Sequence, residues 1–471
     1  MRIVALVAII LALAAPGRAE EAPITPKMRE TAARLIERAL DEDTGYRVVE
    51  SLTTEVGPRL AGTEGEARAR DWAVAKLNEL GFKNVRVEPF EVPLWERGVE
   101  TAEITTPYPQ KLIITALGGS PATPREGVEG AVVSFASLEA LGAAAPSSLK
   151  GKIVFIDEKT TRTQDGSGYG AGVRKRYDTP FDVQGAGAVG VLIRSVGTSS
   201  HRFPHTGSML SGREEEPVPA AALSAPDADQ IARALERGEE VRVRMTLTPV
   251  SRSAAPSGNV IAEIPGRTRP EEIVLISAHL DSWDLGTGAV DDGAGVGIVV
   301  GAASVINETL RRAPKRTIRI VLFGSEEVGL VGARAYNHAH ADELSEHIIA
   351  AESDFGASTI WRFDSRVAED KLLVADAIGL ALAPLGIARG GNEARGGPDM
   401  RVLRASGVPV AGLIQNGWDY FDLHHTPNDT FDKIDPEELA QNVAAYAAFA
   451  YLAAETDAYF RAAPEPLALS E

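Results

Sequence analysis

The sequence predicts an α/β fold: a mainly parallel mixed sheet flanked by helices, interrupted by a small β-rich inserted unit. From residue 258 onward, apolar strand-like runs alternate with helical segments, which is typical of a parallel sheet covered on both faces. A helix followed by an alternating strand stands before residue 100. Between these two stretches the strand-like runs are short and separated by Pro, Gly and Ser. The two α/β stretches therefore form one discontinuous domain.

The first predicted elements are a helix and a strand. Thr63 stands three residues ahead of Glu66, a spacing that forms a capping box at the start of a helix. Apolar residues follow at helical intervals, and Gly81 ends the segment. The run NVRVEPFEV (84–92) alternates apolar and polar residues, so we expect a half-buried strand there.

The inserted unit, 101–252, is predicted to contain short strands and one helix. The strands are expected at 150–158, 187–195 and 241–250, and the helix at 224–238. The segments 169–177 and 201–213 are predicted to be irregular surface loops. His201 and His205 are four residues apart, but no helical period and no acid accompany them. We interpret them as loop histidines rather than metal ligands.

The second α/β stretch, 253–471, completes the domain that begins at 20–100. A helix is expected at 291–312, another through Tyr336, and a last one after Asp435, with Pro436 at its first position, where a missing N–H is tolerated. Strands are expected at NVIAEIPG (259–266), EEIVLISAH (271–279), TIRIVLFG (317–324), HIIAAESD (347–354) and GVPVAGLIQ (407–415).

Composition limits the classes of partner. The formal net charge of −18 argues against nucleic acid and anionic membranes as partners. The chain has no cysteine, so it has neither disulfides nor thiolate metal ligands. With 471 residues, 44% of them hydrophobic, it can bury more than one core.

The N-terminus has the pattern of an export signal. Met1 and Arg2 precede an apolar run from Ile3 to Ala15, and Gly17-Arg18-Ala19 follows. The run is too short to span a bilayer comfortably. We predict a cleaved signal peptide, 1–19, a periplasmic or secreted protein, and no membrane insertion after cleavage.

Residues of metal-ligand type follow several predicted strands. Parallel strands place their carboxyl ends at one edge of a sheet, where sites form. Imidazoles with two or three carboxylates per ion suit a pair of zinc ions that activates water. Each residue alone has an ordinary alternative as a helix cap or a loop residue, but together they predict a metal centre. The residues are His279, Asp281, Asp291, Glu326, Glu327, Asp354, His424 and His425. Asp281, two residues after His279, is placed to accept the second N–H of that imidazole.

These motifs carry a family resemblance. The chain resembles the co-catalytic zinc aminopeptidase and glutamate carboxypeptidase family, and within it the carboxypeptidase Q branch. The matching segments are GPRLAGTEGE (57–66), AHLDSWDLGTGAVDDGAG (278–295), GSEEVGLVGA (324–333), ESD (352–354) and HHTPNDT (424–430). The inserted unit is similar to a protease-associated domain through KGKIVFID (150–157) and VPAAALSAPDADQI (218–231).

The resemblance implies a ligand set for two Zn²⁺ ions per chain. Asp291 would bridge both ions. His279 and Asp354 would hold one ion, and Glu327 and His425 the other. Co²⁺ or Mn²⁺ can occupy the same ligand types.

Further roles follow from the same resemblance. Glu326 would be the general base, taking a proton from water and returning it to the departing amine. His424 stands where many relatives carry a tyrosine that stabilises the oxyanion, so that role falls to its imidazole. A cis peptide is implied between Asp291 and Asp292.

The implied activity is hydrolysis of short peptides, especially dipeptides, by a dipeptidase or aminopeptidase type of exopeptidase. A free α-amine could meet an acid such as Asp284 or a carboxylate near the metals. The resemblance also implies a homodimer. Two alternatives remain: related zinc amide chemistry, such as deacylation or glutaminyl cyclisation, and a non-catalytic binding ectodomain. The number of bound metal ions distinguishes these possibilities.

Overall fold

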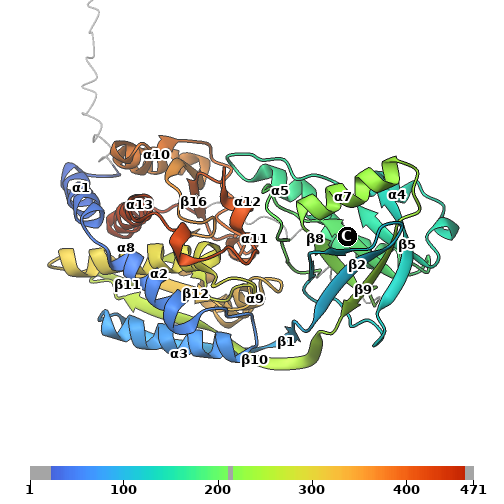
Figure 1. Ribbon diagram of the computed structural model, residues 1–471. Helices are drawn as coiled ribbons and strands as arrows, with labels where there is room; N and C mark the ends of the chain where they lie inside the picture. The colour runs from blue at the N-terminus through green and yellow to red at the C-terminus, as the bar shows by residue number, and fades with distance from the viewer. Residues whose placement is uncertain (1–22, 210–215, 462–471) are drawn as a thin grey trace, which may run out of the picture.

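Two lobes make up the protein, and each is built on one eight-stranded sheet (Figure 1). The structure, a computed structural model, describes residues 23–209 and 216–461. The predicted signal peptide, 1–19, lies outside the described residues. The chain enters the second lobe after β1 and returns to the first along β10, which pairs antiparallel with β1. This long ribbon runs between the two lobes (Figure 1).

The first sheet has a parallel centre, and antiparallel pairs flank this centre on both sides. β12, β11, β13 and β16 are parallel neighbours, whereas β1–β10, β10–β12 and β14–β16 are antiparallel pairs. This is the mainly parallel mixed sheet that the sequence predicts. In spatial order the strands are β1 (Lys83–Glu96), β10 (Val250–Ile264), β12 (Arg316–Phe323), β11 (Arg269–His279), β13 (His347–Glu352), β16 (Val410–Gln415), β14 (Ile360–Arg366) and β15 (Ala388–Arg389).

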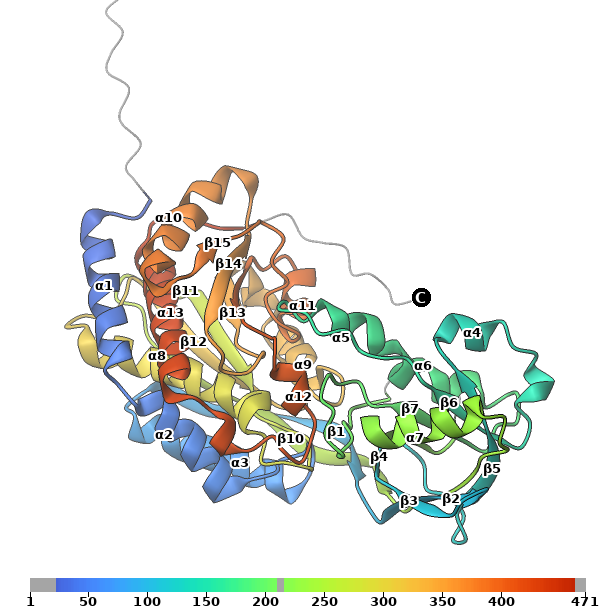
Figure 2. The ribbon, with the colours of Figure 1, turned by 45° about the horizontal axis from the view of Figure 1, so that its top comes forward.

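Helices cover both faces of this sheet (Figure 2). One face carries α1 (Pro26–Leu40), α2 (Thr44–Ser51), α3 (Glu64–Glu79), α8 (Ala294–Thr309), α10 (Leu372–Leu382) and α13 (Pro436–Glu455), and the other carries α9 (Val331–Ala339) and α11 (Met400–Ala405). The predicted caps are present: Thr63 Oγ1 accepts from the Glu66 N–H, and Asp435 accepts from the N–H groups of Glu437 and Glu438.

α8 is the central helix of this core. Its residues from Ala294 to Ile306 are all buried. Within the described chain, Ala289–Thr309 is long and apolar enough to cross a membrane, but it is buried inside the protein. A Cβ on Gly297 would lie 2.6 Å from the carbonyl oxygen of Gly45. Glycine is therefore required where α8 passes α2, because any side chain would separate the helices.

The second lobe is also a mixed sheet with helices. Its strands in spatial order are β3 (Gln110–Leu112), β2 (Glu100–Thr106), β9 (Arg242–Leu247), β5 (Val128–Phe135), β6 (Lys152–Ile156), β7 (Gly190–Arg194), β8 (Ala220–Leu223) and β4 (Ile114–Ala116). Its helices are α4 (Leu138–Gly142), α5 (Ser167–Gly172), α6 (Arg174–Asp182) and α7 (Ala225–Glu236).

The prediction of an irregular loop at 169–177 was wrong. That segment lies in α5 and α6. Four glycines between 166 and 172 lower its helical propensity, but Tyr169 and Val173 pack against the apolar cluster of the lobe. Packing of these side chains outweighs the weak propensity.

A buried histidine at the start of β13 gives the fold a pH dependence. His347 has no exposed surface. Its Nδ1–H donates to the carbonyl of Glu343 at 3.0 Å, and its Nε2 lies 2.8 Å from the hydroxyl of Tyr336. Burial lowers the pKa of His347 from 6.5 to about 4.

We therefore expect acid to destabilise the fold through His347. Below pH 6.5 the unfolded chain binds a proton that the folded chain excludes, so about 2 kcal/mol is lost between pH 6.5 and 5. His347→Gln should be less stable at pH 7.5 and should lose less stability on acidification than wild type, measured by urea unfolding. His338→Gln, on the exposed side of α9, is the control. An equal acid loss in His347→Gln and wild type would contradict this assignment.

Candidate metal centre

The site forms where the chain leaves the parallel strands. β11 ends at His279, β12 at Phe323, just before Glu326 and Glu327, and β13 at Glu352, just before Asp354. His424 and His425 follow the short helix α12 (Tyr420–Leu423), after β16. These carboxyl ends share one edge of the sheet, and the side chains listed above as candidate ligands meet there.

Asp291 lies at the middle of the cluster. Its Oδ1 is 3.1 Å from Nε2 of His279, and its Oδ2 is 3.2 Å from Nε2 of His425. Each imidazole donates its Nδ1–H to a backbone carbonyl, that of Asp281 at 3.0 Å and that of Thr206 at 3.2 Å. Both Nε2 atoms are thereby turned toward the carboxylates.

Two further carboxylates complete two groups around Asp291. Asp354 Oδ1 lies 3.5 Å from Nε2 of His279, and Glu327 Oε2 lies 3.0 Å from Nε2 of His425. His279, Asp291 and Asp354 present ligand atoms within 4.8 Å of one another, as do Asp291, His424 and His425. Both of these sets contain Asp291, whose Oδ1 faces His279 and whose Oδ2 faces His424 and His425. Glu327 lies beside the second set through its contact with His425.

The donor set fits divalent cations. Asp291 Oδ2 and Glu327 Oε1 are buried and have no hydrogen-bond partner among the described residues. Buried polar atoms are nearly always paired, and an unpaired carboxylate oxygen is costly. Imidazole nitrogen and carboxylate oxygen are zinc ligands, so two cations held by these residues would satisfy both orphaned atoms.

Electrostatics favour positive charge at the same place. Burial alone would lower the pKa of both imidazoles, but Asp354 raises that of His279 well above its usual value, and Glu327 with Asp291 raises that of His425 to about 9. Burial raises the pKa of Asp354 and Glu327. The carboxylates favour positive charge beside them, and their own negative charges are poorly solvated. Bound cations would supply that positive charge and compensate the lost solvation.

Asp281 contacts a different group from the one predicted. Its carboxylate is 3.7 Å from Nδ1 of His279, which instead donates to the Asp281 carbonyl. The carboxylate accepts from the backbone N–H groups of Glu326, at 3.0 Å, and Glu327, at 3.3 Å. Asp281 therefore joins the loop after β11 to the loop after β12 and fixes the backbone of the glutamate pair.

Three polar residues that the sequence analysis did not single out hold the Asp291 segment. The Asp292 carboxylate accepts from the N–H groups of His279 and Gly295, and that of Asp429 from the N–H groups of Val290 and Asp291. Arg59, fully buried, donates to the carbonyls of residues 280, 287 and 288. Arg59 and Asp429 lie in the segments 57–66 and 424–430, which carry the family resemblance. Their place in these segments is the sequence feature that could have indicated a role at the site. The Asp291–Asp292 peptide is cis, as the resemblance implied.

The remaining two predicted residues border the cluster. Glu326 is partly exposed, whereas its neighbour Glu327 is buried. His424 stacks on His425, with ring centroids 3.5 Å apart, and its Nε2 lies 3.5 Å from Asp291 Oδ2. Burial, followed by the nearby His425, lowers the pKa of His424 well below its usual value. This shift favours the neutral form of His424, whose buried Nδ1 has no partner among the described residues.

Asp284 is not free to bind a substrate amine, contrary to the expectation from the sequence. Both of its oxygens accept from the guanidinium of Arg97, at 2.7 and 2.8 Å. Arg97 belongs to the segment between β1 and β2, so this ion pair links the second lobe to the loop that follows His279.

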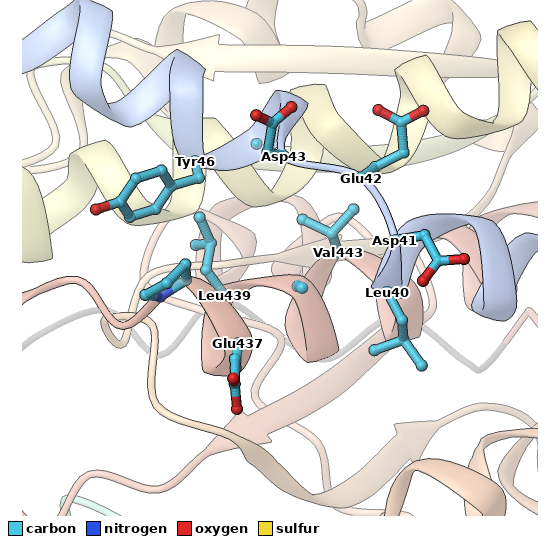
Figure 3. Close-up of a pocket in the computed structure, with 11 residues that line it drawn as sticks. Leu40, Asp41, Glu42, Asp43, Tyr46, Glu437, Leu439 and Val443 are labelled. Carbon is cyan, nitrogen blue, oxygen red and sulfur yellow. The ribbon is translucent and has the colours of Figure 1, made fainter.

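A separate hollow lies between the end of α1 and the start of α13 (Figure 3). Its volume is about 210 Å³. Figure 3 shows the carboxylates of Asp43 and Glu437 pointing away from each other, and no histidine lines the hollow. Its acids do not converge as those of the metal centre do.

The sequence and the fold of this chain are similar to those of known peptidases. Residues 259–450 match Peptidase family M28. The chain is 33% identical over 416 residues to carboxypeptidase Q of Bos taurus, covering 88% of this chain and 86% of that protein. A peptidase M28 precursor from Shewanella amazonensis has a similar structure, with a TM-score of 0.90 at 50% identity, covering 93% of this chain and 99% of that one. An aminopeptidase from Aneurinibacillus sp. strain AM-1, 24% identical, shares the fold with a TM-score of 0.64, covering 93% of this chain and 98% of that one. The chain therefore belongs to peptidase family M28.

Proposed function

We propose that this peptidase is an exported di-zinc exopeptidase that hydrolyses short peptides. The observation that carries the proposal is Asp291, whose two oxygens face two imidazoles in two ligand groups. His279 and Asp354 would hold one ion, and Glu327 and His425 the other. Zinc bound there would supply Lewis-acid polarisation of a carbonyl and a water of lowered pKa.

Glu326 is the proposed general base. Glu326 is partly exposed, while the carboxylate of its neighbour Glu327 lies 3.0 Å from Nε2 of His425. Burial, with Asp354 and Glu327 nearby, raises the pKa of Glu326 well above its usual value. A carboxylate with a raised pKa is suited to take a proton from the attacking water and to return it to the departing amine. Asp281 holds the Glu326 backbone in place for both transfers.

His424 is the proposed oxyanion donor. As a neutral imidazole it can present one N–H, and its Nδ1 has no partner among the described residues. A fixed N–H aimed at the developing negative charge needs no reorganisation during the reaction. Rings of Tyr169, Tyr420 and Phe421 surround His424, with centroids 5.0 to 5.2 Å away, and fix its plane.

The substrate class and location extend the proposal. The relatives named carboxypeptidase Q and aminopeptidase support a peptide trimmed from one end, and we propose dipeptides as the first substrates. The export pattern of residues 1–19 supports a periplasmic or secreted enzyme. The second lobe is proposed to be a protease-associated-like domain, and the protein a homodimer.

The general base can be tested by Glu326→Gln. Because the amide cannot accept the proton, we expect zinc content to stay at the wild-type level while dipeptide turnover falls roughly 10²–10⁴-fold. Turnover is measured on a dipeptide panel with and without chelator, and Glu369→Gln, on an exposed site, serves as the control. Near wild-type hydrolysis by Glu326→Gln would overturn this assignment, and chelator-resistant hydrolysis by wild type would overturn the zinc mechanism.

The role of Asp281 can be tested by Asp281→Asn. The amide has the same size but turns a donor toward one of two backbone N–H groups that need acceptors. We expect about 1–3 kcal/mol of destabilisation and a fall in turnover, measured by urea unfolding and dipeptide hydrolysis. The control is Asp370→Asn, which is fully exposed. Unchanged stability in Asp281→Asn would show that these hydrogen bonds do not matter.

A further inference from the structure

The loop that carries His424 and His425 is bonded to the second lobe. His205 Nδ1–H donates to the carbonyl of His424 at 2.7 Å. The Thr206 N–H donates to the carbonyl of His425 at 3.0 Å, and the His425 Nδ1–H donates back to the carbonyl of Thr206 at 3.2 Å. His205 is 3% exposed and Thr206 is fully buried. In both ribbon views α12, which directly precedes His424, lies on the side of the first lobe that faces the second lobe (Figures 1 and 2).

The backbone of His425 needs this support. Its φ is +62°, in the left-handed region that residues with a side chain rarely adopt. Such a conformation persists only where the surroundings fix it. The three bonds to residues 205 and 206 hold the carbonyls on either side of that φ and the imidazole itself. They therefore determine where Nε2 of His425 points.

Thr206 is itself rigidly held. Its hydroxyl donates to the carbonyl of Ala116 at 2.9 Å and accepts from Arg97 Nη2 at 3.0 Å. Its carbonyl also accepts from Arg176 at 3.3 Å. The same Arg97 binds both oxygens of Asp284, in the loop after His279. One arginine between β1 and β2 thus connects the loop after His279 to Thr206, which binds His425.

The second lobe also contacts the loop after β11 through the side chain of Trp283. This side chain follows Asp281 in the chain, yet it packs into an apolar cluster of the second lobe and is 4% exposed. A Cβ on Gly118 would lie 2.1 Å from its ring, so glycine leaves the space that the indole fills. The lobe is therefore anchored on the loop after β11 as well as on the loop after α12.

We propose that His205 and Thr206 are positioning residues of the metal centre, so that the second lobe completes the site rather than only adjoining it. This inference rests on the proposed function, in which His425 is a zinc ligand. The partner that receives the second N–H of a metal-bound histidine fixes its orientation, and loss of such a partner weakens metal binding. Here that partner and its support come from a segment more than 200 residues earlier in the chain.

The test is a zinc titration with a competing chelator on wild type, His205→Phe and His205→Asn. Phenylalanine removes the donor to the His424 carbonyl, whereas asparagine keeps an N–H near the position of Nδ1. We expect one of the two zinc equivalents to bind about 10–100-fold more weakly in His205→Phe, the other to be retained, and His205→Asn to restore most of the affinity. His201→Phe, the same change at an exposed histidine of the same segment, should bind as wild type does.

The outcomes separate the two proposals. Wild type that binds fewer than two zinc ions would overturn the proposed function. Wild type that binds two, with unchanged affinities in His205→Phe, would overturn the positioning role alone, as would equal weakening of both equivalents. If circular dichroism shows that His205→Phe does not fold, His205→Gln replaces it, because its donor is displaced by one methylene. Equal zinc affinities in the Asn and Gln variants would then contradict the inference.

Discussion

Asp291 imposes the main constraint on this structure, because one buried carboxylate must face two imidazoles that come from segments far apart in the chain. Its backbone is held by Asp429 and its neighbour Asp292 caps His279 and Gly295. These acids can be buried together only where backbone N–H groups, a guanidinium or bound cations compensate their charge. The parallel sheet supplies the rest of the arrangement, since its strands end at one edge and deliver ligands from distant parts of the sequence.

The same constraint explains why the two lobes are joined so closely. A metal centre requires ligands held within a fraction of an ångström, and each imidazole needs a fixed acceptor for its second N–H. His279 obtains it from the carbonyl of Asp281 in its own loop, whereas His425 obtains it from Thr206 in the other lobe. Arg97 and Trp283 bind the lobes together next to these acceptors. The inserted lobe thus contacts the candidate ligand His425 through the backbone carbonyl of Thr206.

Much of the first lobe could be predicted from periodicity, because its strands are long apolar runs and its helices begin at Thr63 and Asp435 with recognisable caps. The candidate ligands could be placed at one edge because His279, Glu327 and Asp354 stand at or just after the ends of parallel strands. The acceptor of the His279 N–H, the pairing of Asp284 with Arg97, and the burial of His205 could not be predicted. Each depends on contacts between residues far apart in the chain or on backbone atoms, which leave no periodic pattern in the sequence. α5 was not predicted because its glycines have low helical propensity, and packing of its side chains stabilises the helix instead.

The most direct test of the account is the number of zinc ions that the protein and its Asp291→Ala variant bind, measured by metal analysis after equilibration with zinc. If Asp291 is shared, wild type holds two ions per chain and the single substitution weakens both, although four of the five proposed ligands remain. One ion in wild type, or two ions held as tightly by Asp291→Ala as by wild type, would contradict the shared carboxylate on which the proposed mechanism depends.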